Sequence, residues 1–272
     1  MRGLLSGILT GVAFFASSAV VLAQNEMWDS YMSRIDNRPA TVLVDMSLIL
    51  RAPEDRFPYL VITGPQTTNV AKNGIPGPAV IEELEQVLTA TDNFLTGVTA
   101  KILTGTLTYN GQRNNYYYVR DTANVRAALA RMYNRNFKGY KYSLIIKHDP
   151  EWLTYRTFLY PDEATQNWMD NNRIITGLLQ KGDSLSKTRS ISYAACFSND
   201  TARNIFTDFV TRSGFKMDKL HTVKTSTTPQ CIVFSKQGSI MPADSLNKNT
   251  MLIRTEVKRL KGYYNGWSVN DN

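Results

Sequence analysis

Histidine and cysteine are scarce in this sequence, with two of each among 272 residues. His148 and His221 lie far from each other in the chain. No CxxC or HExxH pattern is present, and the glycines fit neither a GxGxxG nor a P-loop pattern. We therefore expect no metal site and no cofactor, because zinc and nucleotide sites depend on such spacings.

The two cysteines, Cys196 and Cys231, allow two interpretations. In an oxidising compartment an even pair is typical of a disulfide. The alternative is two buried thiols, since cysteine is among the most buried residue types. The sequence leaves both open.

Long apolar runs are missing except at the N-terminus. Arg2 precedes an apolar stretch from Leu4 to Val21, and small or branched residues then stand before Gln24. This pattern predicts a signal peptide over residues 1–23. An uncleaved anchor is the alternative, but it needs about 20 apolar residues, and the centre of this run is rich in Gly, Ala and Ser. We expect cleavage, a periplasmic or secreted protein, and no transmembrane segment in the remainder.

Positive charge exceeds negative charge: 31 Lys and Arg face 23 Asp and Glu, a net charge of +8. The densest basic segments, Arg126 to Lys141 and Arg254 to Lys261, fall late in predicted helices, where cations suit the helix dipole. We interpret them as solvated helix ends and expect no specific nucleic-acid site. Attraction to an anionic envelope surface is compatible with this charge.

Hydrophobic periodicity and turn signals predict an α+β fold. The clearest local signal is Asn110-Gly111, which is typical of a tight β-hairpin. A break at Tyr160-Pro161-Asp162 divides the chain into residues 24–162 and 163–272. In each part we predict the element order β-α-β-β-α-β, and the first part has an additional N-terminal strand pair. The fold class is thus two tandem ferredoxin-like, split βαβ, antiparallel-sheet sandwiches.

Some boundaries of these elements are specific predictions. A strand is expected from Ala40 to Leu50, which is nearly continuous in apolar and β-branched residues. The helix after Pro161 is expected to turn Trp168, Ile175, Leu178 and Leu179 inward.

Aromatic side chains crowd the end of the first part and the C-terminus. Their flat faces and polar tips suit binding surfaces, although aromatic residues also pack across strands. A cleft between the two parts would make some of them accessible. The candidate binding surface consists of Asp149, Glu151, Trp152, Tyr155, Tyr160 and Trp267.

Catalytic chemistry has little support. His148 precedes Asp149, but neighbours on an extended segment point in opposite directions and do not readily form a base and its orienting acid. We predict no catalytic residue and favour a non-enzymatic protein.

Two family resemblances account for nearly all of the chain after the leader. From Trp28 to about Pro161 the sequence resembles the bacterial family catalogued as domain of unknown function 695, in TrpAspSerTyr, Arg38-Pro39-Ala40, the Tyr116 to Tyr118 run and Asp149-Pro150-Glu151-Trp152. From about Glu163 it resembles the family of the regulator of ribonuclease E activity B. The matching features there are Gly182-Asp183, Arg189, Ser213-Gly214-Phe215 and Gly262-Tyr263-Tyr264-Asn265-Gly266-Trp267, where Asn265 replaces the usual Asp.

The second resemblance implies a ferredoxin-like fold, binding to ribonuclease E and inhibition of RNA cleavage. Ribonuclease E is cytoplasmic, whereas the leader predicts export. Our leading hypothesis is an exported envelope protein that binds another protein or a glycan without catalysis. The alternatives are an envelope hydrolase or carbohydrate-binding protein with a cleft between its domains, and a ribonuclease regulator or nucleic-acid binder.

Overall fold

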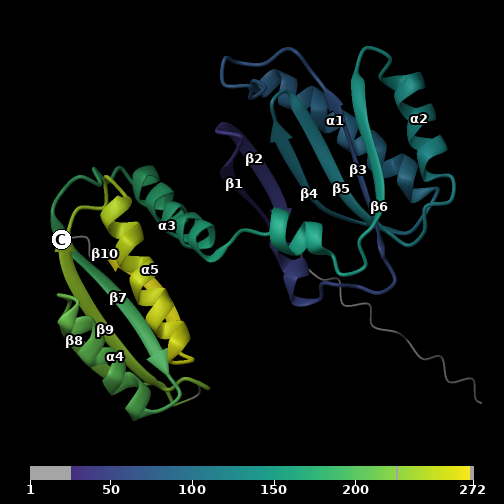
Figure 1. Cartoon of the computed structure of the whole chain (residues 1–272). Coiled ribbons are helices and arrows are strands. Elements are labelled where there is room, and N and C mark those ends of the chain that lie inside the picture. Colours follow the sequence, from purple (N-terminus) through teal and green to yellow (C-terminus); the bar gives the residue numbers. More distant parts are fainter. Residues whose placement is uncertain (1–25, 225, 270–272) are drawn as a thin grey trace, which may run out of the picture.

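The computed structural model describes residues 26–224 and 226–269. They form two α+β units in tandem, each built on one antiparallel sheet (Figure 1). This confirms the predicted α+β class. The predicted leader, residues 1–23, lies outside the described residues.

The first unit contains a six-stranded sheet in the order β1-β2-β4-β5-β3-β6. Its strands are β1 (Trp28–Ile35), β2 (Arg38–Asp45), β3 (Tyr59–Gln66), β4 (Lys101–Tyr109), β5 (Gln112–Val119) and β6 (Lys141–His148). Its helices are α1 (Pro78–Thr96) and α2 (Val125–Asn136), with a 3-10 helix η1 (Met46–Leu50) and a short π-helix η2 (Thr154–Leu159).

The second unit contains a four-stranded sheet in the order β10-β7-β9-β8. Its strands are β7 (Arg189–Phe197), β8 (Lys216–Thr222), β9 (Gln230–Gly238) and β10 (Tyr263–Val269). Its helices are α3 (Glu163–Gln180), α4 (Asp200–Arg212) and α5 (Asp244–Arg259).

Both sheets share one strand permutation. In the second unit, β7 lies between β10 and β9, and β8 is at the edge. In the first, β3 lies between β6 and β5, with β4 next to β5. In each case the first strand of the β-α-β-β-α-β series lies between the fourth and the third. The hairpin of β1 and β2 extends the first sheet beyond β4.

The first sheet is buried on both faces, and β5 shows this most directly. Tyr116 and Tyr118 belong to the core that includes Trp152 and Tyr155. Tyr117 points the other way, into the core beneath α1 and α2. Side chains alternate along a strand, so the run of three tyrosines supplies both cores.

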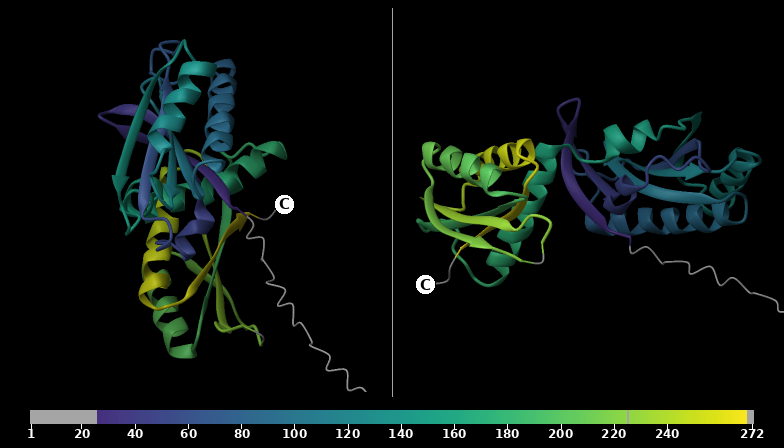
Figure 2. Two further views of the ribbon diagram at one scale, coloured as in Figure 1. Left: turned by 90° about the vertical axis from the view of Figure 1, so that its right-hand side faces the viewer. Right: turned by 90° about the horizontal axis from the view of Figure 1, so that it is seen from below.

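The second unit has one core, on the helical face of its sheet. Figure 2 shows α4 and α5 lying along the same face. Phe206 of α4 and Ile253 of α5 pack against inward residues of the central strands, including Tyr193 and Phe234. Among the described residues, no helix is long and apolar enough to cross a membrane.

Local signals locate most turns. Asn110 and Gly111 both have positive φ, 48° and 75°, as a two-residue type I′ hairpin requires. The predicted strand from Ala40 to Leu50 is wrong at its end. It stops at Asp45, whose carboxylate accepts a hydrogen bond from the backbone N–H of Ser47 and caps the 3-10 helix. An apolar run does not distinguish a strand from a buried helical turn.

Candidate functional site

Asp149 lies directly after β6 and accepts several hydrogen bonds. Its carboxylate accepts hydrogen bonds from the Tyr118 hydroxyl (2.7 Å) and from the backbone N–H groups of Leu153 (2.9 Å) and Thr154 (3.0 Å). Burial favours the neutral acid, but these hydrogen bonds outweigh burial and lower the pKa of Asp149. The carboxylate therefore holds the turn after β6 in place.

Trp152 and Tyr155 lie in the core, which corrects the prediction that they form a surface. Both side chains are fully buried. The Trp152 ring stacks on Tyr118 at 4.1 Å between centroids, and its indole N–H donates to the carbonyl of Phe57 at 3.0 Å. The Tyr155 hydroxyl donates to the carbonyl of Asp45 at 2.8 Å. The aromatic rings fill the interior beside the sheet, so the predicted cleft is absent at these residues.

The other predicted residues are separated. Glu151 is exposed, and Tyr160 is half-buried with its ring 5.9 Å from that of Tyr155. Trp267 is buried in the other unit, where its indole N–H donates to Asn171 Oδ1 at 2.8 Å. The six residues therefore do not form one binding surface.

Replacing Asp149 with alanine should lower the free energy of unfolding of the first unit by about 2 kcal/mol, because one buried and two part-buried donors lose a charged acceptor. Chemical denaturation measures this. Glu151→Ala, two residues away on an exposed side chain, is the matched control and should change stability by less than about 0.5 kcal/mol. Equal effects of the two substitutions would contradict the structural role of Asp149.

The lowered pKa of Asp149 also predicts a pH dependence. A carboxyl group with a lower pKa in the folded state stabilises the fold above its unfolded pKa of about 3.9. This contribution should disappear as the pH falls below about 4 and through the folded pKa. Asp149→Asn should give a flatter acid limb of stability against pH.

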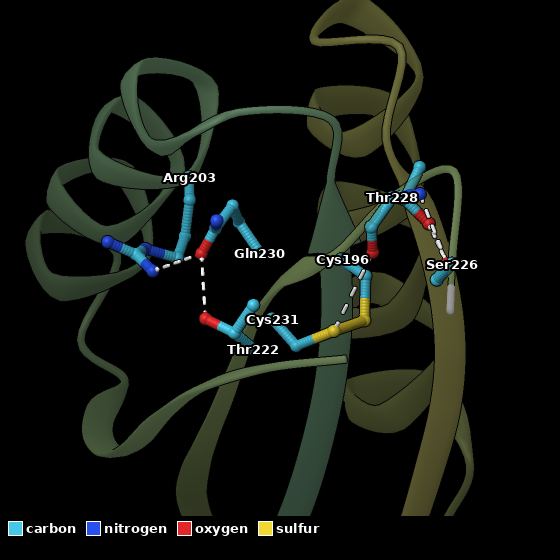
Figure 3. The surroundings of a disulfide bond; sticks show 7 residues. All are labelled: Cys196, Arg203, Thr222, Ser226, Thr228, Gln230 and Cys231. Atoms are coloured by element: carbon cyan, nitrogen blue, oxygen red, sulfur yellow. Dashed lines mark hydrogen bonds between the residues drawn. A yellow bond between two sulfur atoms is a disulfide. The ribbon is translucent and has the colours of Figure 1, made fainter. Parts of the chain in front are cut away.

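Cys196 and Cys231 form a disulfide (Figure 3). They are direct partners in the pairing of β7 with β9, with their Cα atoms 4.0 Å apart. Nearby, Gln230 Oε1 accepts hydrogen bonds from Arg203 (3.0 Å) and from the Thr222 hydroxyl (3.2 Å), which link α4, β8 and β9. The covalent bond thus joins the two central strands of the second sheet.

A groove of about 510 Å³ lies where α3, α5 and the start of β10 meet. We call it the α3–α5 groove. Tyr263 is 61% exposed beside it. Its lining includes Glu163 and Gln166 of α3, Met251, Arg254 and Lys258 of α5, and Tyr263 of β10.

The end of α5 positions the cations of this groove. Lys261 has a positive φ of 53°, and the N–H groups of Lys261 and Gly262 donate to the carbonyls of Lys258 and Val257, which is a Schellman motif. Gly262 is required because a Cβ there would lie 2.5 Å from the Phe197 ring. The chain therefore enters β10 directly with Lys261 at the groove.

Buried amides also hold α3 against α5. Asn171 donates to Asn247 Oδ1 (2.8 Å) and to the Thr250 hydroxyl (2.7 Å), and it accepts from Trp267. The prediction that Trp168 and Leu179 point inward is wrong, since they are 38% and 55% exposed. The helix α3 instead turns Asn167 and Asn171 inward, because both side chains donate hydrogen bonds to residues of α5.

A second hollow of about 530 Å³ lies between β1 and α3. Arg173 lines it and pairs with both Asp29 (2.5 Å) and Asp170 (2.9 Å). Asp170 also pairs with Arg254. In this hollow the carboxylates outnumber the cation Arg173, and Arg173 is paired with two of them. The α3–α5 groove has three cations and one carboxylate in its lining, so it is the stronger candidate for a binding site.

Reasoning from the sequence missed the α3–α5 groove. Its basic residues were interpreted as a solvated helix end. The signal that could have indicated it is the spacing of Arg254, Lys258 and Lys261, at intervals of four and three. This spacing places Arg254 and Lys258 on one face of α5, and Lys261 follows just beyond its end. Within the part of the chain that the structure describes, no group of His, Cys, Asp and Glu could hold a metal ion.

Two family models match this two-unit α+β protein in succession. Residues 26–160 match the Family of unknown function (DUF695), and residues 168–269 match Regulator of ribonuclease activity B. The two matches follow one another in the predicted order, and both predicted resemblances are confirmed.

Other comparisons add little. No curated protein matched the chain. One solved structure, a "putative glycine cleavage system transcriptional repressor", is 10% identical over 78% of this chain and 98% of its own, with a TM-score of 0.22. Another, an unknown protein from Galdieria sulphuraria, is 8% identical over 78% of this chain and 97% of its own, with a TM-score of 0.21. Similarities this weak support no conclusion.

Proposed function

We propose that this chain is an exported protein of the bacterial envelope, periplasmic or secreted, that binds another protein without catalysing a reaction. Two observations support export. The first 23 residues have the pattern of a cleavable leader. The Cys196–Cys231 disulfide suits an oxidising compartment, since stable disulfides are rare in the cytosol.

The α3–α5 groove is the observation that carries the binding proposal. It combines an exposed aromatic ring, Tyr263, with the cation of Lys261, which forms no salt bridge among the described residues. Exposed tyrosine is enriched at protein interfaces. The match of this unit to a family of regulators also favours protein binding.

We further infer that both units are ferredoxin-like. The basis is the strand permutation that they share and their common β-α-β-β-α-β order. In the second unit, this arrangement brings the Tyr263 end of β10 next to α5.

The second candidate is a regulator of a ribonuclease in the cytoplasm, favoured by the family match of residues 168–269. The location of the protein separates the two. A hydrolase or carbohydrate-binding protein with a cleft at Trp152 and Tyr155 is not proposed, because both side chains are buried.

Export and groove binding are tested together in cells expressing the full chain with a C-terminal tag. We expect the mature protein in the periplasmic or secreted fraction with Gln24 as its first residue, and a chain lacking residues 1–23 in the cytoplasm. In the same cells, p-benzoylphenylalanine at position 263 should crosslink to a discrete partner.

The control for the crosslink is the same amino acid at Leu50, which is 91% exposed in the first unit. It should give no such product. Retention of the full chain in the cytoplasm with a crosslink to a ribonuclease would favour the regulator instead. Identical products from positions 263 and 50 would contradict binding at the groove.

A further inference from the structure

The α3–α5 groove carries an excess of positive charge. Arg254, Lys258 and Lys261 line it, and Glu163 is its one lining carboxylate among the described residues. We propose that the groove binds an extended acidic segment of a partner protein, with carboxylates at alternate positions. This inference rests on the proposed function, because it specifies the partner at the same site.

The spacing of the cations fits an extended chain. Arg254 and Lys258 are four residues apart on α5, which corresponds to about 6 Å along a helix. Side chains on one side of an extended segment repeat every two residues, or about 6.6 Å. Lys261 lines the same groove just beyond the end of the helix. Successive carboxylates of such a segment would therefore meet successive cations.

The existing ion pairs leave the two lysines of this row available. Lys258 pairs with Glu163, but both side chains are largely exposed, at 71% and 56%, and such pairs contribute little in water. A partner carboxylate could therefore replace Glu163. Arg254 is more firmly held, since it pairs with Asp170 and lies over the Tyr264 ring at 5.5 Å. Its side chain is therefore held in one orientation, and substituting it would also remove contacts within the protein.

The shape of the groove favours a peptide over a lipid surface. Met251, Val257 and Tyr263 add apolar area to the lining, which suits the side chains and stems of a polypeptide. A membrane surface is flat, whereas this site is a hollow of about 510 Å³. Charge and apolar area together specify a segment that alternates acidic residues with others.

The test uses the mature protein and a short fluorescent peptide that alternates glutamate with threonine, a residue that favours extended backbone. The matched probe replaces each glutamate with glutamine. By fluorescence anisotropy, the glutamate peptide should bind and the glutamine peptide should bind at least about tenfold more weakly. Added salt should weaken binding of the glutamate peptide.

The double substitution Lys258→Glu and Lys261→Glu should weaken binding of the glutamate peptide by at least about tenfold. The milder pair Lys258→Gln and Lys261→Gln should weaken it by a smaller factor, and it guards against loss of the fold at the end of α5. Lys248→Glu is the matched control, because Lys248 is exposed on the same helix and does not line this groove. It should leave binding nearly unchanged.

Equal affinity for the two peptides, or no effect of the substitutions at Lys258 and Lys261, would overturn the proposal. Binding to vesicles of anionic phosphatidylglycerol that depends on these lysines, without binding to the peptide, would also overturn it in favour of a lipid surface. If the peptides fail while position 263 still crosslinks to an exported partner, the acidic segment is wrong and the proposed function stands.

Discussion

Replacing Trp152 with alanine should lower the free energy of unfolding of the first unit by about 3–5 kcal/mol, the usual cost of removing a buried tryptophan ring. The ring is fully buried, stacks on Tyr118 and meets the edge of Tyr155 at 6.1 Å. Its loss leaves a cavity and also leaves the carbonyl of Phe57 without its donor. The substitution relieves no backbone strain, because Trp152 has a φ of 52° and alanine at that φ is strained as well.

Two further variants identify the cause of this loss. Trp152→Phe keeps an aromatic ring but removes the indole N–H, so it should cost about 2 kcal/mol. Leu153→Ala changes a neighbouring side chain that is 55% exposed and should cost less than about 0.5 kcal/mol. Calorimetry of the whole protein should show the transition of the first unit moving while that of the second stays. A loss below about 1 kcal/mol for Trp152→Ala would contradict the burial described here.

The predicted aromatic surface is wrong because the sequence does not determine which aromatic side chains are covered by other segments. The order of strands and helices follows from local signals such as Asn110-Gly111, whose backbone conformation is intrinsic to those residues. Whether Trp152 faces water depends on which other segments cover it. The carbonyl of Phe57 belongs to the loop before β3, and the ring of Tyr118 belongs to β5. Both segments are distant from Trp152 in sequence, so no local pattern predicts these contacts.

The α3–α5 groove is not predicted from the sequence for the same reason, namely that it depends on contacts between distant segments. It forms because α3, α5 and β10 come together, so that Glu163 and Lys258 become neighbours although they are 95 residues apart. The basic residues were visible in the sequence, but a row of cations at a helix end is also what the helix dipole favours. The groove exists because α3 packs beside α5 and β10, with Asn171 of α3 bonded to Trp267 of β10. The sequence alone does not show this packing.

Removing the disulfide, by Cys196→Ala together with Cys231→Ala, should lower the free energy of unfolding of the second unit by about 3 kcal/mol. The bond closes a loop with a sequence separation of 35 residues, and a crosslink of that span restricts the unfolded chain by roughly 3–4 kcal/mol in the chain-entropy model. The two side chains are almost completely buried, so alanine also loses some packing. The transition of the first unit should not move.

The state of the Cys196–Cys231 disulfide should also depend on the cellular compartment of the protein. The wild-type protein recovered from the envelope should contain no thiol that reacts with a maleimide after denaturation, and added reductant should reproduce the stability of the double alanine variant. The chain lacking residues 1–23 should retain two reactive thiols in the cytoplasm, where thiols are kept reduced. Two reactive thiols in the exported protein, or a double variant as stable as the wild type, would contradict the disulfide. The bond would then no longer support export, and the leader pattern alone would remain.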